Sequence, residues 1–143
     1  MISGRCLCGT VVFRLTQKPS HFYRCHCSLC RRQTGTGHNL ATIVNADHFR
    51  WLAGETFIAS WRRPQGYRND FCRNCGSTVP NDLRDRPLIW LPIGLLDDDF
   101  DLHCAGDYCL DDALSWSGHP VENRHQQAPD SLDALLHALH VTP

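Results

Sequence analysis

The sequence predicts a mainly β domain of small sheets with one short helix near its C-terminus. Short runs rich in β-branched and aromatic residues recur about every 8–12 residues, with turn-forming residues between them, which is typical of all-β domains. Nine cysteines are present, and seven of them fall in three tight clusters, a pattern that favours metal binding. Helical periodicity is confined to residues 132–139, where leucines recur at i, i+3, i+4 and i+7.

In the N-terminal part of the chain, the first expected strand covers residues 10–16 and ends at a Lys-Pro-Ser turn. A second strand, residues 21–25, runs into the central cysteine cluster. Residues 28–35 suit a short helical segment, with Ser28 as a candidate N-cap and Gly35 as the residue that stops it.

The middle of the chain alternates between short apolar runs and turns. Its most apolar stretch, residues 87–96, predicts a central strand, and Pro92 within it indicates a bulge or an exposed ladder position. At the C-terminus, Asp130 or Ser131 caps the expected helix. The strands expected before residue 87 cover residues 38–44, 49–52, 56–61 and 67–71.

The length of 143 residues predicts one domain, residues 1–143, with a core at about 4–117 and a polar connector and helix at 118–143. The net charge of −1 gives no sign of a nucleic-acid partner. No apolar run approaches the roughly 18–20 residues that span a bilayer, and the N-terminus has no signal-peptide pattern. We therefore expect a cytoplasmic protein with reduced thiols and no membrane or nucleic-acid contact.

The spacing of Cys72 and Cys75 is that of a zinc knuckle, in which two intervening residues let a tight turn aim both sulfurs at one ion. Cys6 and Cys8 are the obvious second pair, and a glycine follows Cys8 and Cys75 alike. Four thiolates from these two pairs would make a closed tetrahedral zinc site. Closing it would fasten the N-terminal strand to the middle of the chain, so the free energy of metal binding becomes free energy of folding.

The remaining clustered cysteines, Cys25, Cys27 and Cys30, lie on one short segment and can face one ion together. Three thiolates leave the fourth tetrahedral position open, which is the mark of a catalytic zinc, and soft thiolates favour Zn²⁺. A closed structural site is the alternative, and a C-x-x-C redox dithiol is another. Cys104 and Cys109 are expected to be small core residues. The candidates for a fourth ligand in a closed site are His26, His38, Cys104 and Cys109.

Charged residues flank these three cysteines. His26 is a candidate ligand, acid–base group or hydrogen-bond donor to a sulfur, and otherwise an exposed imidazole. Arg24, Arg31 and Arg32 place positive charge beside the thiolates, where they would lower thiolate pKa values and receive a substrate carboxylate. The alternative for each arginine is a solvated surface charge.

The motifs of this chain resemble those of the glutathione-dependent formaldehyde-activating enzyme family, which also contains centromere protein V. The resemblance runs from about residue 4 to Trp116 and is carried by GRCLCG, CHCSLCRRQTG, FCRNCG and IGLLDD, in that order. It implies a β-tent of small antiparallel sheets held by two zinc ions. It also implies the partition of the ligands, with a structural zinc on Cys6, Cys8, Cys72 and Cys75 and a catalytic zinc on Cys25, Cys27 and Cys30.

The activity that the resemblance implies is carbon–sulfur bond formation or cleavage, as in the condensation of glutathione with formaldehyde to S-hydroxymethylglutathione. A substrate thiol would ionise at the open zinc position, with Arg31 and Arg32 holding glutathione carboxylates. Two segments depart from the family pattern, His38 with Asn39 and the two-cysteine stretch 102–116, which leaves the native thiol and electrophile open. The alternative function is a non-enzymatic zinc module for protein interaction.

Overall fold

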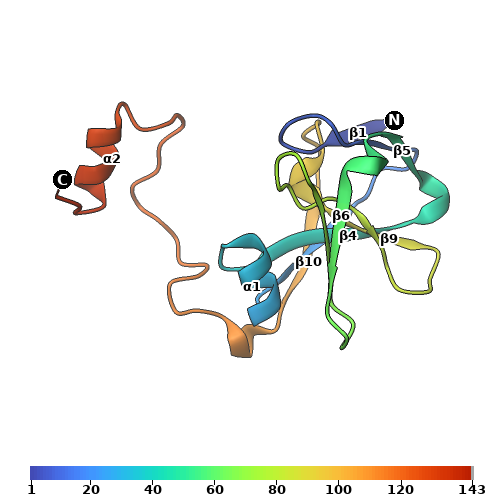
Figure 1. The fold of residues 1–143 in the computed structure, drawn as a ribbon. Helices are drawn as coiled ribbons and strands as arrows, with labels where there is room; N and C mark the ends of the chain where they lie inside the picture. The colour runs from blue at the N-terminus through green and yellow to red at the C-terminus, as the bar shows by residue number, and fades with distance from the viewer. Residues whose placement is uncertain (143) are drawn as a thin grey trace.

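A computed structural model describes residues 1–142 and shows ten strands in three small sheets, together with two short α-helices. The predicted mainly β class is confirmed. The first sheet has three antiparallel strands in the order β1-β2-β5 (Figure 1). These strands are β1 (Ile2–Arg5), β2 (Val12–Leu15) and β5 (Phe49–Ala53).

The largest sheet has five strands in the order β10-β3-β4-β9-β8, and the central cysteine segment begins at the end of β3. Its neighbouring strands are antiparallel except for β10, which lies parallel to β3 and so departs from the expected all-antiparallel arrangement. The strands of this sheet are β3 (His21–Cys25), β4 (Asn39–Asn45), β8 (Asn81–Asp82), β9 (Leu88–Pro92) and β10 (His103–Tyr108).

The third sheet is a two-stranded antiparallel hairpin that delivers Cys72 at its end. Its strands are β6 (Ile58–Arg62) and β7 (Arg68–Cys72). Short 3₁₀ turns connect several of the strands described above. They are η1 (Ala46–His48), η2 (Glu55–Phe57), η3 (Ile93–Leu95) and η4 (Leu110–Asp112).

The helix α1 (Ser28–Thr34) follows closely after the end of β3. Its N-cap is Cys27, whose sulfur accepts a hydrogen bond from the backbone N–H of Cys30 at 3.3 Å. The expectation that Ser28 caps this helix is therefore wrong, since the thiol one position earlier takes that role. Gly35 ends the helix as expected, in the left-handed conformation at φ 68° that glycine adopts readily.

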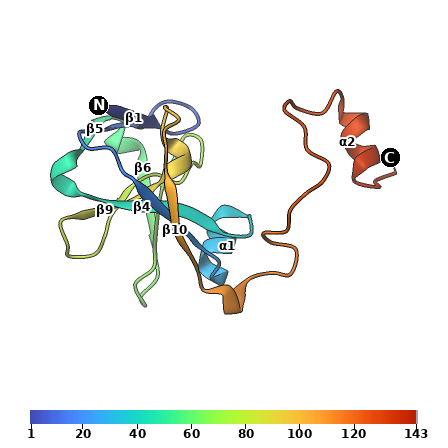
Figure 2. The same ribbon diagram turned by 180° about the vertical axis from the view of Figure 1, so that it is seen from behind.

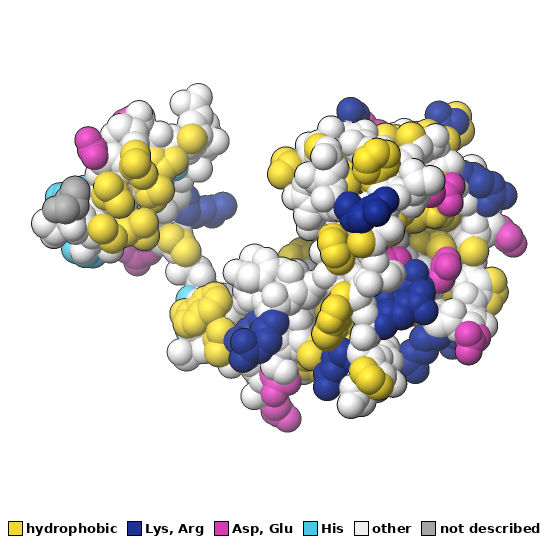
Figure 3. All heavy atoms as spheres, viewed as in Figure 1, with side chains coloured by type: hydrophobic (Ala, Val, Ile, Leu, Met, Phe, Trp, Pro, Cys, Tyr) yellow, Lys and Arg dark blue, Asp and Glu magenta, His cyan; other side chains and the backbone are white. Residues whose placement is uncertain are grey.

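The predicted C-terminal helix is confirmed as α2 (Leu132–Ala138), with Ser131 as its N-cap. Two opposite views show it apart from the sheets, at the end of an extended connector (Figures 1 and 2). Leu132 and Leu139 remain 70% and 60% exposed, and apolar side chains gather on this isolated helix in Figure 3. No helix among residues 1–142 is long and apolar enough to cross a membrane.

Two clusters of buried side chains form the core between the sheets. In the larger one the ring of Phe13 stacks on Phe49, with centroids 5.4 Å apart. The smaller cluster contains two of the predicted structural ligands, so part of the metal site is itself core. The larger cluster comprises Phe13, Leu15, Phe49, Ile89 and Leu91, and the smaller one Cys6, Val11, Cys72 and Val79.

The sequence patterns miss β1, β10 and the two-residue β8, and overextend the strand predicted at residues 87–96. β1 reads ISGR and β10 reads HCAGDY, and neither shows the regular apolar alternation that marks a strand. The predicted strand ends at Pro92 because proline has no N–H to continue the ladder, and η3 follows it. β9 is nonetheless an inner strand, as predicted.

The packing of β1 against β2 predicts an effect of replacing Gly4 with alanine. A Cβ at Gly4 would collide with the ring of Phe13, which is only 1% exposed and has little room to move. We expect Gly4→Ala to lower the free energy of unfolding by about 1–3 kcal/mol, measured by denaturant titration. Gly94→Ala is the control, because nothing lies within 4 Å of its added Cβ. Equal stability of the two variants would contradict this packing.

Candidate metal centre

The first cysteine cluster joins two tight turns that are distant in the sequence. The sulfurs of Cys6, Cys8, Cys72 and Cys75 all lie within 4.8 Å of one another. Both turns close with the same backbone hydrogen bond, from the glycine N–H to the carbonyl of the first cysteine, at 3.0 Å and 2.7 Å. Each glycine has φ near +80°, so these turns need glycine and aim both cysteines inward. The four sulfurs fit a tetrahedral zinc site.

Hydrogen bonds and burial affect these four thiols differently. Hydrogen bonds to Thr10, and a further one to Asn74, lower the pKa of Cys8 to about 5. A hydrogen bond to Ser77 lowers the pKa of Cys75 to about 7, while burial raises the pKa of Cys72 to about 11. A cation between them would stabilise the buried thiolate as well as the exposed ones.

The second cluster is the triad of Cys25, Cys27 and Cys30, whose sulfurs also lie within 4.8 Å of one another. Cys25 ends β3, Cys27 caps α1 and Cys30 lies one turn into that helix, so the strand–helix junction gathers all three. A zinc–sulfur bond of about 2.3 Å places two tetrahedral ligands about 3.8 Å apart. Three soft donors at this spacing fit zinc and leave one ligand position to another group.

Local interactions distribute charge unevenly over the triad. Burial raises the pKa of Cys30 and of Cys25 above the ordinary thiol value. Burial also acts to raise the pKa of Cys27, but hydrogen bonds, the first of them from the backbone N–H of Cys30, bring it below that value. Cys27 is therefore the one triad thiol whose pKa lies below the ordinary thiol value.

A charged clamp from β10 holds the triad segment in place. His26 is 5% exposed, and its Nε2 lies 2.8 Å from Oδ1 of Asp107. Arg24 donates to the same carboxylate at 3.0 Å. The hydrogen bond from His26, together with Arg24, lowers the pKa of Asp107, so the carboxylate is ionised and His26 Nε2 is the donor. Asp107 carries no sequence signal of its own, because its partners lie more than eighty residues away.

A cavity of about 380 Å³ opens beside the triad, and Cys25 and Cys30 form part of its wall. Tyr67, from the β6–β7 hairpin, also lines the cavity. Its hydroxyl lies 3.9 Å from the sulfur of Cys30 and donates a hydrogen bond to Gln33. Burial raises the pKa of Tyr67. Trp90 donates to the Tyr23 hydroxyl at 2.8 Å on another wall. The arginines that line the cavity are Arg62, Arg63, Arg68 and Arg84.

The cavity lining carries these four arginines and two aspartates, Asp82 and Asp85, so positive charge is in excess. Arg68 is neutralised by a two-pronged contact with Asp70, at 2.7 Å for each nitrogen–oxygen pair. Arg62, Arg63 and Arg84 take part in no salt bridge within residues 1–142. Their positive charge is therefore available to an anionic ligand. The sequence motifs do not indicate this role, because Arg62 and Arg63 are brought to the cavity beside the triad only when the hairpin folds.

The residues predicted from sequence occupy three kinds of place. Cys25 and Cys30 line the cavity, whereas Cys27 and His26 are not among its lining residues. Arg31 and Arg32 sit on the last turn of α1, outside the cavity lining, and the Arg32 side chain is exposed. The expectation that Cys104 and Cys109 are core residues is wrong, because both thiols are exposed at and just beyond the end strand of the five-stranded sheet.

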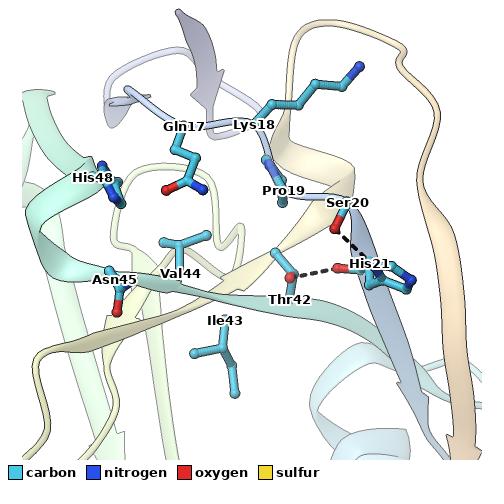
Figure 4. Close-up of a pocket in the computed structure, with 10 residues that line it drawn as sticks. All are labelled: Gln17, Lys18, Pro19, Ser20, His21, Thr42, Ile43, Val44, Asn45 and His48. Carbon is cyan, nitrogen blue, oxygen red and sulfur yellow. Dashed lines mark hydrogen bonds between the residues drawn. The ribbon is translucent and has the colours of Figure 1, made fainter.

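A second cavity, of about 260 Å³, is lined by residues of the loop before β3 and by β4 (Figure 4). His21 and Ser20 share a 2.9 Å hydrogen bond at its edge, and Thr42 donates to the His21 carbonyl at 2.7 Å. The polar groups of these residues already bond one another, and no cysteine is among the residues of this cavity. The triad cavity therefore remains the candidate site.

Comparisons with known proteins agree with this assignment. Residues 1–110 match the family described as Glutathione-dependent formaldehyde-activating enzyme. A Rhodobacter sphaeroides protein of known crystal structure shares the fold, with a TM-score of 0.57 and 22% identity, covering 71% of this chain and 98% of the other. No protein with a curated description matches the chain. Because the family match includes both cysteine clusters and more than half of the residues, the chain belongs to the glutathione-dependent formaldehyde-activating enzyme family.

Proposed function

We propose that the protein is a zinc-dependent enzyme of the carbon–sulfur lyase type that acts on glutathione or a related thiol adduct. The observation that carries the proposal is the cavity of about 380 Å³ that combines two triad thiols with arginines that have no ion-pair partner. A thiol bearing carboxylates matches both features, because its sulfur suits the metal and its carboxylates suit guanidinium groups. Family membership supports the same class of substrate.

The proposal assigns two zinc ions per chain, a structural one on the first cysteine cluster and a catalytic one on the triad. Zinc bound at the triad stabilises the thiolate form of a substrate at neutral pH. All nine cysteines are free thiols, which suits a reducing compartment, and we therefore assign the protein to the cytoplasm.

The cavity residues bind and orient the substrate in this proposal. Arg62, Arg63 and Arg84 receive the carboxylates of the thiol. The forward reaction joins the thiol sulfur to the carbonyl carbon, and the thiol proton ends on the carbonyl oxygen, giving a hydroxyl. The reverse reaction breaks the same carbon–sulfur bond and returns the proton to sulfur.

We assign His26 a positioning role, which is not one of the roles expected from the sequence; of those, the exposed imidazole is wrong, because His26 is 5% exposed. Its Nε2 is engaged by Asp107 at 2.8 Å, and its ring does not line the cavity. His26 therefore holds the segment between two metal ligands against β10 and acts on the reaction through them.

The proposed activity is tested by turnover with a panel of thiols. Exchange spectroscopy with ¹³C-labelled formaldehyde and glutathione measures the rate at which the carbon–sulfur adduct forms and breaks. Catalysis that disappears in Cys27→Ser supports the proposal. Absence of catalysis with every carboxylate-bearing thiol and aldehyde tested, in protein that holds both metals, would instead favour a non-enzymatic zinc module.

The two metal clusters are expected to respond differently to loss of one ligand. Elemental analysis should find about two zinc ions per chain. Cys72→Ser should lose solubility or fold, because it removes a buried ligand that joins distant segments. Cys27→Ser should keep its far-ultraviolet circular dichroism and one zinc, since the triad closes no long loop. A Cys72→Ser variant that folds normally with both metals would remove the structural assignment.

Two sets of arginines are candidates for holding the substrate carboxylates, and calorimetry distinguishes them. A charge-assisted hydrogen bond contributes roughly 1.5–3 kcal/mol, so Arg62→Ala, Arg63→Ala or Arg84→Ala should weaken glutathione binding about 10- to 150-fold without changing zinc content. Arg31→Ala and Arg32→Ala, outside the cavity lining, are the matched comparison. Weaker binding only in Arg31→Ala and Arg32→Ala would support the expectation from sequence that these two arginines hold the carboxylates. Unchanged affinity in all five variants would leave the glutathione assignment to family membership alone.

A further inference from the structure

Cys109 lies beside the triad although it is far from it in the sequence. Its sulfur is 3.9 Å from that of Cys25, and both are free thiols. The approach follows from the parallel pairing of β10 with β3, which sets Tyr108 opposite Cys25 and puts Cys109 at the next position.

The position of Cys109 is held from both sides. Before it, the Tyr108 carbonyl accepts a hydrogen bond from the His26 N–H at 2.9 Å, and Asp107 is clamped by Arg24 and His26. After it, the N–H of Asp112 donates to the Cys109 carbonyl at 3.1 Å in η4. Cys109 itself has φ 58° and ψ 42°, a left-handed conformation that a non-glycine residue keeps only where its surroundings impose it.

The separation of the two sulfurs matches a shared metal. Two thiolates on one tetrahedral zinc lie about 3.8 Å apart when each zinc–sulfur bond is about 2.3 Å. The observed 3.9 Å agrees with that edge for Cys25 alone. The Cys109 sulfur lies outside the group of three triad sulfurs that are all within 4.8 Å of one another, so its side chain must rotate inward to meet the other two edges.

Among the described residues, the histidine candidates for a fourth ligand do not join the triad sulfurs, although Nδ1 of His26 and Nδ1 of His38 are both buried without a hydrogen-bond partner. His26 Nε2 bonds to Asp107 at 2.8 Å, and the ring of His38 packs on that of His26, with centroids 4.9 Å apart. Cys104, on the same strand as Asp107, points its thiol to the Gly106 carbonyl at 3.7 Å. Of the four residues that the sequence offers, Cys109 is the one whose donor atom contacts a triad sulfur.

Cys109 differs from the triad thiols in two respects that suit an exchangeable ligand. Its side chain is exposed, and its sulfur does not belong to the group whose members all lie within 4.8 Å of one another. Rotation about its side-chain bonds therefore takes the sulfur toward solvent without disturbing packed residues.

We propose that Cys109 is the exchangeable fourth thiolate of the triad zinc, bound in the absence of substrate and displaced by the incoming thiol. In the exchange the substrate thiol gives up its proton and binds, while the Cys109 sulfur leaves and takes up a proton, so zinc keeps four sulfur ligands throughout. This inference rests on the proposed function, because it needs zinc at the triad and a thiol substrate.

The test is pulsed alkylation of the reduced protein with both zincs bound, read residue by residue in the mass spectrometer. Cys104 is the matched control, an exposed cysteine on the same stretch of chain. We expect Cys109 to react about 10-fold or more slowly than Cys104. Saturating glutathione should bring the two rates together, whereas S-methylglutathione, which has no free thiol, should leave Cys109 protected.

Chelator competition gives a readout independent of substrate. Cys109→Ser should release the zinc of the triad about 10-fold or more faster than Cys104→Ser does. Both variants should retain the zinc of the first cysteine cluster. Equal alkylation of Cys109 and Cys104 in the two-zinc protein, with equal zinc release from the two variants, would overturn the inference and leave the proposed function standing. A chain mass lower by two hydrogens, showing Cys109 in a disulfide, would also overturn it. A protein that retains only one zinc would instead remove the proposed catalytic site itself.

Discussion

The contact between two cysteine turns, one after β1 and one after β7, is the constraint on which the remaining structure depends. Each turn is too short to bury anything by itself, but together they place Cys6 and Cys72 in the core with Val11 and Val79. This cluster joins the three-stranded sheet to the β6–β7 hairpin, and the hairpin carries Tyr67 and three of the cavity arginines to the cavity beside the triad. Four like-charged sulfurs gathered in one place repel one another unless a cation lies between them, so fold and metal binding are linked here.

The two cysteine clusters share a chemistry but differ in connectivity. The first cluster links segments more than sixty residues apart, whereas the triad gathers three ligands from a single strand–helix junction. The first is therefore suited to holding the domain together. The second is held by other means, chiefly the carboxylate of Asp107 between Arg24 and His26.

Features encoded in neighbouring residues could be predicted from the sequence, whereas features created by distant pairing could not. The spacing within each cysteine turn, the stop at Gly35 and the Ser131 cap all depend on residues a few positions apart, and the structure agrees with them. The strand β10 has a polar, exposed sequence and exists because β3 offers it an edge. Asp107 and the hairpin arginines owe their places to that kind of pairing, so no local pattern marks them. Cys109 could be named from sequence only as one of four candidates for a fourth ligand.

The late position of β10 along the chain has a consequence for synthesis on the ribosome. All ligands of the first cluster exist once residue 75 has been made, and the three-stranded sheet needs nothing beyond residue 53. The triad is translated earlier, yet β3 keeps an unpaired edge until residues 103–108 emerge to cover it. A nascent chain between these lengths has a closed first cluster and a triad with neither its carboxylate clamp nor its neighbouring thiol. Metal that arrives in that interval would meet three cysteines on an open edge, so the order of translation separates assembly of the first cluster from completion of the surroundings of the triad.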